Sequence, residues 1–160
     1  MSQITLLKSF LLIISSVYFT SCAKIGVFEK TVPIPSQSWF YNNRPSFTFT
    51  ITDTSTSYNI YIVLRHTDAY IYNNIWLALG SQAPGDTMRF QNINLELGND
   101  AMGWEGTGMD DIFEIRKNIT NGPIPFKKTG DYTFTIAQIM RENPLKHILN
   151  VGIRVEKVEL

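Results

Sequence analysis

Two histidines, His66 and His147, are the side chains of this sequence that come nearest to hydrolytic chemistry. A Ser-His-Asp triad needs one histidine beside a nucleophilic serine, yet the sequence contains no Gly-x-Ser-x-Gly turn to expose that serine. A zinc site needs three or four ligands, and two isolated histidines with a single cysteine do not form such a cluster. The sequence therefore predicts no catalytic residue, and we expect a protein that is not an enzyme.

Five acidic residues lie in or near a glycine-rich segment, Gly103 to Gly108, and their oxygens are of the kind that binds Ca²⁺. They are Asp100, Glu105, Asp110, Asp111 and Glu114. Their spacing matches no EF-hand loop. A phosphate site would need a helix after the glycines and a Lys-Ser/Thr pair, and the sequence has neither. We therefore expect a structural loop over residues 98–108, with no metal and no cofactor.

Aromatic side chains offer a third kind of chemistry, because their rings stack on sugars and anchor protein interfaces. Trp104 and Tyr70 fall in loop-like stretches, where binding residues are common. We predict that these two residues contact a partner protein or a glycan. Trp76 lies inside an apolar run and is expected in the core.

The only cysteine, Cys22, follows an apolar run near the N-terminus. Lys8 precedes this run, which extends from Phe10 to Phe19, and the order is typical of a secretory signal. Residues 19–22, Phe-Thr-Ser-Cys, resemble a lipobox, in which the cysteine thiol receives a diacylglyceryl group and the chain is cleaved just before it. We predict a cleaved signal peptide over residues 1–21 and an acylated, palmitate-bearing Cys22. A plain signal with an accidental cysteine and a short uncleaved anchor are the alternatives.

The composition indicates one β-rich domain. The 160 residues include 19 Ile, 7 Val and 15 Thr, and these branched side chains favour strands over helices. Fourteen basic residues balance fourteen acidic ones, so the chain lacks the positive charge that a nucleic-acid binder needs. A length of 160 residues fits a single domain with its own core.

Alternating apolar and polar residues predict strands after the signal. The clearest runs are Phe47 to Ile51, Tyr58 to Leu64 and Tyr132 to Ile136. We expect the first two to pair as an antiparallel hairpin around the intervening polar turn. Further strands are expected over residues 74–80, 90–97, 112–119 and 151–155, of which 112–119 could instead hold a helical turn.

About eight short strands without a long helix indicate an all-β protein, a single antiparallel β-sandwich of the jelly-roll or immunoglobulin-like type. We assign residues 22–30 to the lipidated cysteine and its tether, and residues 31–160 to the sandwich domain.

Several stretches occur in an order that is informative when they are taken together. They are residues 72–77 (YNNIWL), 103–108 (GWEGTG) followed by 111–112, 130–134 (GDYTF), 138–141 (QIMR) and 145–152. With the signal that ends at Cys22, they resemble the GldH family of gliding-motility lipoproteins from Bacteroidetes. The resemblance covers nearly the whole chain.

The resemblance implies an outer-membrane lipoprotein that is needed for gliding and linked to the type IX secretion machinery. It implies no catalytic residue, so Cys22 alone carries over as a functional position. The residues after Cys22 lack the acidic run that marks surface-exported lipoproteins, which favours a domain that faces the periplasm.

We therefore expect a non-enzymatic structural or interaction component of that machinery. Its expected partners are membrane lipid, through Cys22, and other cell-envelope proteins. The alternative is a lipoprotein whose β-sandwich binds glycans or peptidoglycan.

Overall fold

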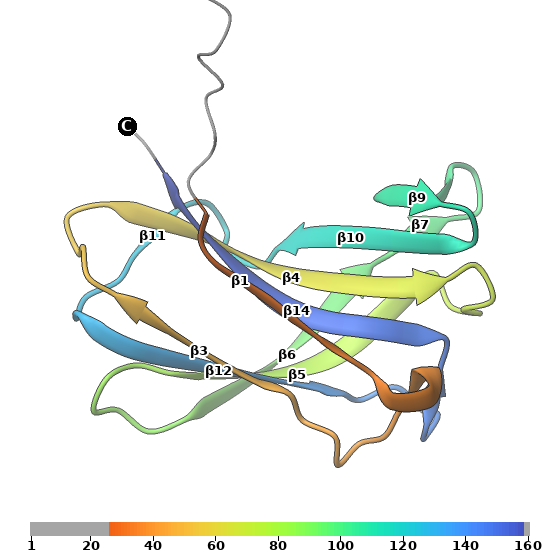
Figure 1. The fold of residues 1–160 in the computed structure, drawn as a ribbon, viewed down its shortest axis with the longest axis horizontal. Helices are drawn as coiled ribbons and strands as arrows, with labels where there is room; N and C mark the ends of the chain where they lie inside the picture. Colours follow the sequence, from red (N-terminus) through yellow and green to blue (C-terminus); the bar gives the residue numbers. More distant parts are fainter. Residues whose placement is uncertain (1–25, 159–160) are drawn as a thin grey trace, which may run out of the picture.

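The computed structural model describes residues 26–158, and this part of the chain is built almost wholly from strands. Two antiparallel sheets form the two layers of a sandwich (Figure 1), which confirms the predicted fold class. The elements are β1 (Gly26–Pro33), the 3-10 helix η1 (Pro35–Gln37), β2 (Ser38–Trp39), β3 (Ser46–Ile51), β4 (Ser57–Thr67), β5 (Asn74–Gln82), β6 (Arg89–Glu96), β7 (Gly98–Asn99), β8 (Gly103–Trp104), β9 (Thr107–Met109), β10 (Ile112–Asn118), β11 (Ile124–Pro125), β12 (Gly130–Gln138), β13 (Leu145–Lys146) and β14 (Ile148–Val158). None of these described elements is a helix long and apolar enough to span a bilayer.

The six-stranded sheet has the order β1-β14-β4-β10-β9, with β11 paired to β4, and the four-stranded sheet has the order β3-β12-β5-β6. Two short ladders, β13-β2 and β7-β8, lie outside them. Strand β1 already pairs with β14 at Gly26, opposite Glu156. The sandwich therefore begins before residue 31, and residues 26–30 of the expected tether belong to it.

The core lies between the two sheets because each strand turns alternate side chains inward. In β3 the inward residues Phe47, Phe49 and Ile51 are buried, and the intervening Thr48 and Thr50 are exposed. The largest fully buried side chains come from both sheets and from the segments that join them. They are Trp39, Phe47, Ile51, Ile62, Leu64, Ile75, Leu77, Leu79, Leu97, Ile136, Leu145 and Ile148.

The expected hairpin between β3 and β4 is wrong, because the two strands lie in different sheets. Strand β3 pairs with β12, whereas β4 pairs with β14 and β10. The turn between them crosses from one layer to the other and is held by the Tyr58 hydroxyl, which donates to the Asp53 carbonyl (2.6 Å). Both strands thus bury their apolar faces against each other across the core instead of side by side.

The loop expected over residues 98–108 contains short strands. Strands β7 and β8 pair with each other, and β9 pairs with the beginning of β10. Gly106 has φ of +92°, and a Cβ there would collide with the carbonyl of Glu114. This close approach of two backbones explains why a glycine stands at that position. Residues 112–118 form a strand rather than a helical turn, because they pair along β4.

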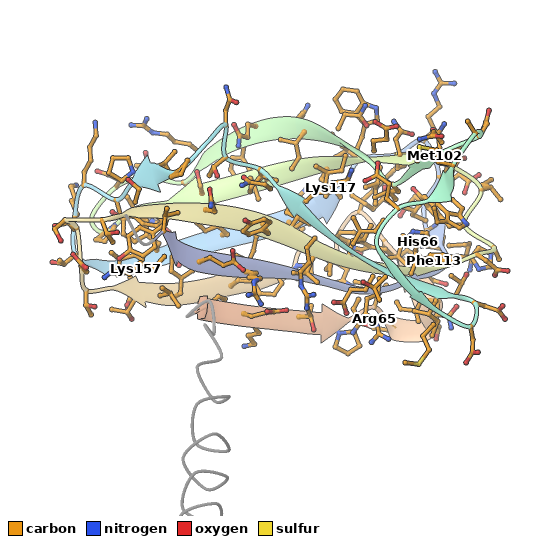
Figure 2. The ribbon with its side chains drawn as sticks, turned by 90° about the horizontal axis from the view of Figure 1, so that it is seen from above. Arg65, His66, Met102, Phe113, Lys117 and Lys157 are labelled. Atoms are coloured by element: carbon orange, nitrogen blue, oxygen red, sulfur yellow. The ribbon has the colours of Figure 1, made fainter. Side chains whose placement is uncertain are left out.

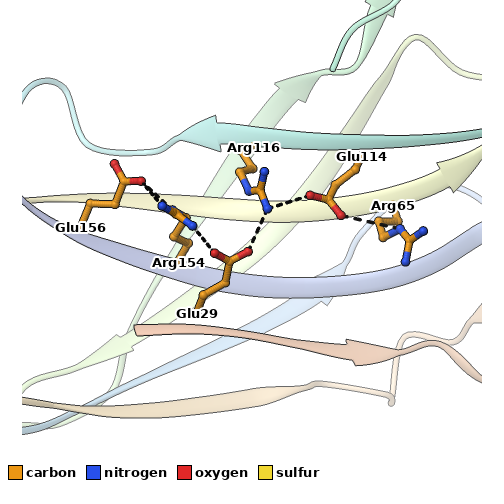
Figure 3. Close-up of polar contacts among 6 residues, drawn as sticks. All are labelled: Glu29, Arg65, Glu114, Arg116, Arg154 and Glu156. Atoms are coloured by element: carbon orange, nitrogen blue, oxygen red, sulfur yellow. Dashed lines mark hydrogen bonds and ion pairs between the residues drawn. The ribbon is translucent and has the colours of Figure 1, made fainter. Parts of the chain in front are cut away.

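A chain of ion pairs crosses the outer face of the six-stranded sheet (Figure 3). In order, the paired residues are Glu156, Arg154, Glu29, Arg116, Glu114 and Arg65. Burial raises the pKa of Glu29, but its hydrogen bonds to Arg154 and Arg116 and their charges outweigh burial and hold that pKa below its ordinary value. These ion pairs thereby connect β1, the first described strand, to β14 and β10.

Replacing Gly152 in β14 with alanine should destabilise the sandwich, since the new methyl group would meet the backbone of β1. The site is buried, and a Cβ there would press on the Lys30 carbonyl oxygen and on Thr31. We expect a loss of about 1–3 kcal/mol in the free energy of unfolding, measured by urea denaturation. Gly26→Ala is the matched control, because its Cβ would lie 3.8 Å from the guanidinium of Arg154. Equal stability of the two variants would contradict this account of the β1–β14 contact.

Glu29→Gln should remove about 1 kcal/mol of stability at pH 7, because the pairs of this network are partly exposed. Since the folded pKa of Glu29 lies below its unfolded value, its contribution is present above about pH 4.3 and disappears as the pH falls through the folded pKa. Urea denaturation should therefore show a larger difference between wild type and variant at pH 7 than at pH 3. Glu96→Gln, at an exposed position of β6 with no ion pair in the described chain, is the control. A difference that does not shrink as the pH is lowered from 7 towards 2 would rule out the carboxylate as its source.

Candidate functional site

The predicted lipid attachment site, Cys22, lies outside the described residues, as does the predicted signal peptide. Cys22 precedes Gly26, the first residue of β1, by four positions. Four residues span at most about 14 Å when fully extended. A lipid on Cys22 would therefore keep the start of β1 close to the membrane surface.

The structure brings the predicted contact residues Trp104 and Tyr70 together at the end of the sandwich that carries β7 to β9. Their ring centroids lie 6.2 Å apart, and both border a cavity of about 290 Å³. Tyr70 is only 3% exposed, and its hydroxyl donates to the carbonyl of Asn74 (3.0 Å). Trp104 is half-buried. The Tyr70 ring is therefore packed inside the protein and presents no open face.

His66 packs against both of these rings and is completely buried. Figure 2 shows it beside Phe113. Its ring centroid is 4.6 Å from that of Trp104 and 5.7 Å from that of Phe113. Its Nδ1 lies 2.8 Å from the carbonyl oxygen of Thr67, to which it donates, and Nε2 has no partner within residues 26–158. Burial lowers the pKa of His66, which favours the neutral ring. No serine or carboxylate of the described chain hydrogen-bonds to it, so these contacts are those of a packed core residue.

Of the five acidic residues near the glycine segment, Asp110, Asp111 and Glu114 border one cavity of about 520 Å³, together with Arg65 and Arg116. Glu105 pairs with Lys117, and Glu114 pairs with Arg65 and Arg116. In the part of the chain that the structure describes, no three histidine, cysteine or acidic side chains come together as metal ligands.

The outer face of the four-stranded sheet carries several exposed apolar side chains that the sequence analysis did not place there. Trp76 is 44% exposed, so its expected position in the core is wrong. Its neighbours Ile75 and Leu77 take the inward positions of β5, and the alternation of a strand turns Trp76 outward. Phe90 of β6 is 65% exposed and lies over Gly80, where a Cβ would come within 2.9 Å of the ring.

Two adjoining cavities of about 320 and 340 Å³ lie on this face. We call them together the apolar groove. The first is bordered by Tyr41, Arg44, Ala78, Phe90, Thr135 and Ala137, among others, and the second by Tyr72, Asn74, Trp76 and Arg141; both share Ile139 and Met140. The small side chains of β5 and β12 form the floor of the groove, and larger aromatic and aliphatic side chains form its walls.

Most polar groups that border the groove are already bonded within the protein. The Tyr41 hydroxyl donates to the carbonyl of Met140 (2.7 Å). The Gln138 amide nitrogen donates to the carbonyls of Trp39 (3.1 Å) and Glu142 (3.0 Å), and its oxygen accepts from the Met140 N–H (2.8 Å). These bonds fix the segment after β12, so the groove has a well-defined shape and an apolar lining.

The other half of the same face is polar. The hydroxyls of Thr48 and Thr133 lie 2.9 Å apart across β3 and β12, and the Thr50 hydroxyl donates to Asp131 (2.6 Å). The apolar groove is therefore a bounded patch, which is the form that interaction sites take on soluble domains. The sequence did contain a signal for this patch. Ile75, Leu77 and Leu79 alternate along β5 as its inward residues, so Trp76 and Ala78 between them must point outward.

Comparison with known proteins identifies relatives that match this chain over the whole sandwich. The model of the GldH lipoprotein family matches residues 26–155. The gliding motility lipoprotein GldH of Flavobacterium johnsoniae is 26% identical over 157 residues, which cover 94% of this chain and 96% of that protein. The gliding motility lipoprotein GldH homolog of Christiangramia forsetii is 25% identical over 155 residues, or 92% and 94% of the two chains. The resemblance found in the sequence is confirmed, and the chain belongs to the GldH lipoprotein family.

Proposed function

We propose that this protein is a non-enzymatic docking component of the gliding-motility and type IX secretion apparatus, anchored by lipid in the outer membrane and facing the periplasm. The observation that carries the proposal is the apolar groove, where exposed aromatic and aliphatic side chains gather on one bounded face. Aromatic residues at such surfaces supply much of the binding energy of protein interfaces.

The anchoring half of the proposal is supported by the family, whose members are lipoproteins, and by the position of Cys22. Attachment to a membrane confines the domain to a surface, where its effective concentration near other anchored proteins is high. A modest interface then suffices for stable association. The two features, anchor and groove, thus complement each other.

A non-enzymatic role is supported by the surroundings of the residues that could do chemistry. His66 is enclosed by aromatic rings, and the carbonyl of His147 accepts a hydrogen bond from the backbone of Thr67 (3.1 Å). The carboxylates of Glu105 and Glu114 are engaged in ion pairs.

The alternative function, glycan binding, was expected at Trp104 and Tyr70. Burial of Tyr70 leaves it without an open ring face there. Two of the exposed aromatic side chains, Trp76 and Phe90, border the groove instead. The groove is therefore the surface at which protein and glycan ligands must be compared.

Cys22→Ala should abolish incorporation of radiolabelled palmitate and move the protein from the outer-membrane fraction to the soluble periplasmic fraction. Two acyl chains already give stable anchoring, and loss of the thiol removes the attachment point. Cell movement over agar should be lost as well. Ser21→Ala, which keeps the thiol, is the matched control and should behave like wild type. A soluble Cys22→Ala protein that fully supports movement would falsify the anchoring half of the proposal.

Phe90→Thr combined with Trp76→Thr should abolish both cell movement and co-purification with envelope proteins, while the free energy of unfolding changes by no more than about 1 kcal/mol per site. Threonine keeps the strand propensity of β5 and β6, so the loss is one of exposed apolar surface. Met102→Thr with Met109→Thr removes two apolar side chains that are even more exposed but lie outside the groove, and is the matched control. If the control variant loses movement to the same extent, the groove is not the docking surface.

A further inference from the structure

The charges around the apolar groove differ from those on the opposite face of the sandwich. Arg44 borders the first cavity and Arg141 the second, and no acidic residue borders either one within the described chain. The Arg44 side chain reaches only its neighbouring carbonyl at Tyr41 (3.4 Å). Neither arginine has an ion-pair partner among residues 26–158. Glu142, next to Arg141, accepts a hydrogen bond from the Tyr72 hydroxyl (2.8 Å).

On the outer face of the six-stranded sheet, by contrast, the arginines have ion-pair partners. There Arg65, Arg116 and Arg154 each face a glutamate (Figure 3). The same chain therefore pairs its arginines on one face and leaves two cations beside an apolar hollow on the other. Unpaired arginines at the border of a groove attract carboxylates and orient the ligand that carries them.

The polar groups of the groove argue against a sugar as that ligand. A glycan exposes many hydroxyls, and each one that leaves water needs a new hydrogen-bond partner. The Tyr41 hydroxyl and both ends of the Gln138 amide are already bonded within the protein. An apolar side chain fits such a lining, whereas a sugar would lose hydrogen bonds there.

The position of the groove argues against a lipid surface as the source of the acidic groups. The described chain begins at Gly26 in β1, an edge strand of the six-stranded sheet. The groove lies on the outer face of the four-stranded sheet. That sheet is the other layer of the sandwich in Figure 1. Because Cys22 is only four residues before Gly26, a lipid on Cys22 would hold the start of β1, on the layer opposite the groove, close to the membrane. The groove then faces partners other than that membrane.

We infer that the apolar groove binds an extended peptide segment of a partner protein, with an apolar side chain in the hollow and carboxylates flanking it near Arg44 and Arg141. The inference deepens the proposed function and rests on it, since it names the chemistry of the docked partner. Phe90 and Trp76 contact the apolar part of the segment, and the two arginines set its direction.

The test begins with a photo-crosslinking amino acid at position 90 of the lipidated full-length protein in its own envelope. Mass spectrometry then identifies the cross-linked partner segment. We expect a segment with an apolar residue and at least two Asp or Glu residues close to it. The same probe at Thr48, on the polar half of the same face, should give no such product. A product that contains only glycan or lipid, or a protein segment without acidic residues, overturns the inference.

A synthetic peptide of the identified segment supplies the second measurement, by calorimetry with the purified protein. Arg44→Glu with Arg141→Glu should raise its Kd by about tenfold or more, and added salt should weaken wild-type binding. Arg89→Glu, on the same sheet and outside the lining of both cavities, should change Kd less than twofold. Thermal unfolding of each variant confirms that it is folded.

The failures of the two proposals are distinguishable. If charge reversal leaves Kd unchanged while Phe90→Thr abolishes binding, docking at the groove stands and the acidic character of the segment is wrong. If neither change affects binding, the groove is not a docking site and both proposals fail.

Discussion

Each strand of this protein has two faces, and the sandwich can bury only one of them. Alternation in β3, β4, β5 and β12 sends large apolar side chains into a shared core, which hydrophobic burial stabilises. The other two faces remain in contact with solvent. Function in such a domain therefore depends on what the sequence places at the outward positions, and the two outer faces of this chain are built in opposite ways.

The charges on the outer face of the six-stranded sheet are paired with one another, because Glu29 of β1 binds both Arg116 of β10 and Arg154 of β14. A cavity of about 520 Å³ lies beside these charges and is bordered by Arg65, Glu114 and Arg116. A partner that used it would first have to compete with their ion pairs. The outer face of the four-stranded sheet has hydroxyls over β3 and an apolar groove over β5 and β12. Among residues 26–158, the second face combines open apolar area with two arginines that have no ion-pair partner, which is the chemistry of a binding surface.

The sequence predicted the strands well where period-2 alternation was clean, as at Phe47 to Ile51 and Tyr132 to Ile136. It could not predict which strands pair, because a polar turn suits a hairpin and a crossover between layers equally well. The site was missed for a different reason. A tryptophan in an apolar run suggests the core, but the phase set by Ile75 and Leu77 turns Trp76 outward. Tyr70 shows the reverse error, since a residue outside any strand can still pack beneath neighbouring loops.

The short distance between Cys22 and β1 links the anchor to the orientation of the binding face. A long flexible tether would let the domain tumble, and any face could meet a partner. Four residues allow far less freedom, and the ion pairs of Glu29 hold β1 to the rest of its sheet. If the lipid is attached at Cys22, as proposed, the six-stranded layer would be the one next to the membrane, and the groove on the opposite layer would face outward. An anchored domain of this kind pays for little orientational entropy when it docks, so a shallow groove with two cations can be sufficient.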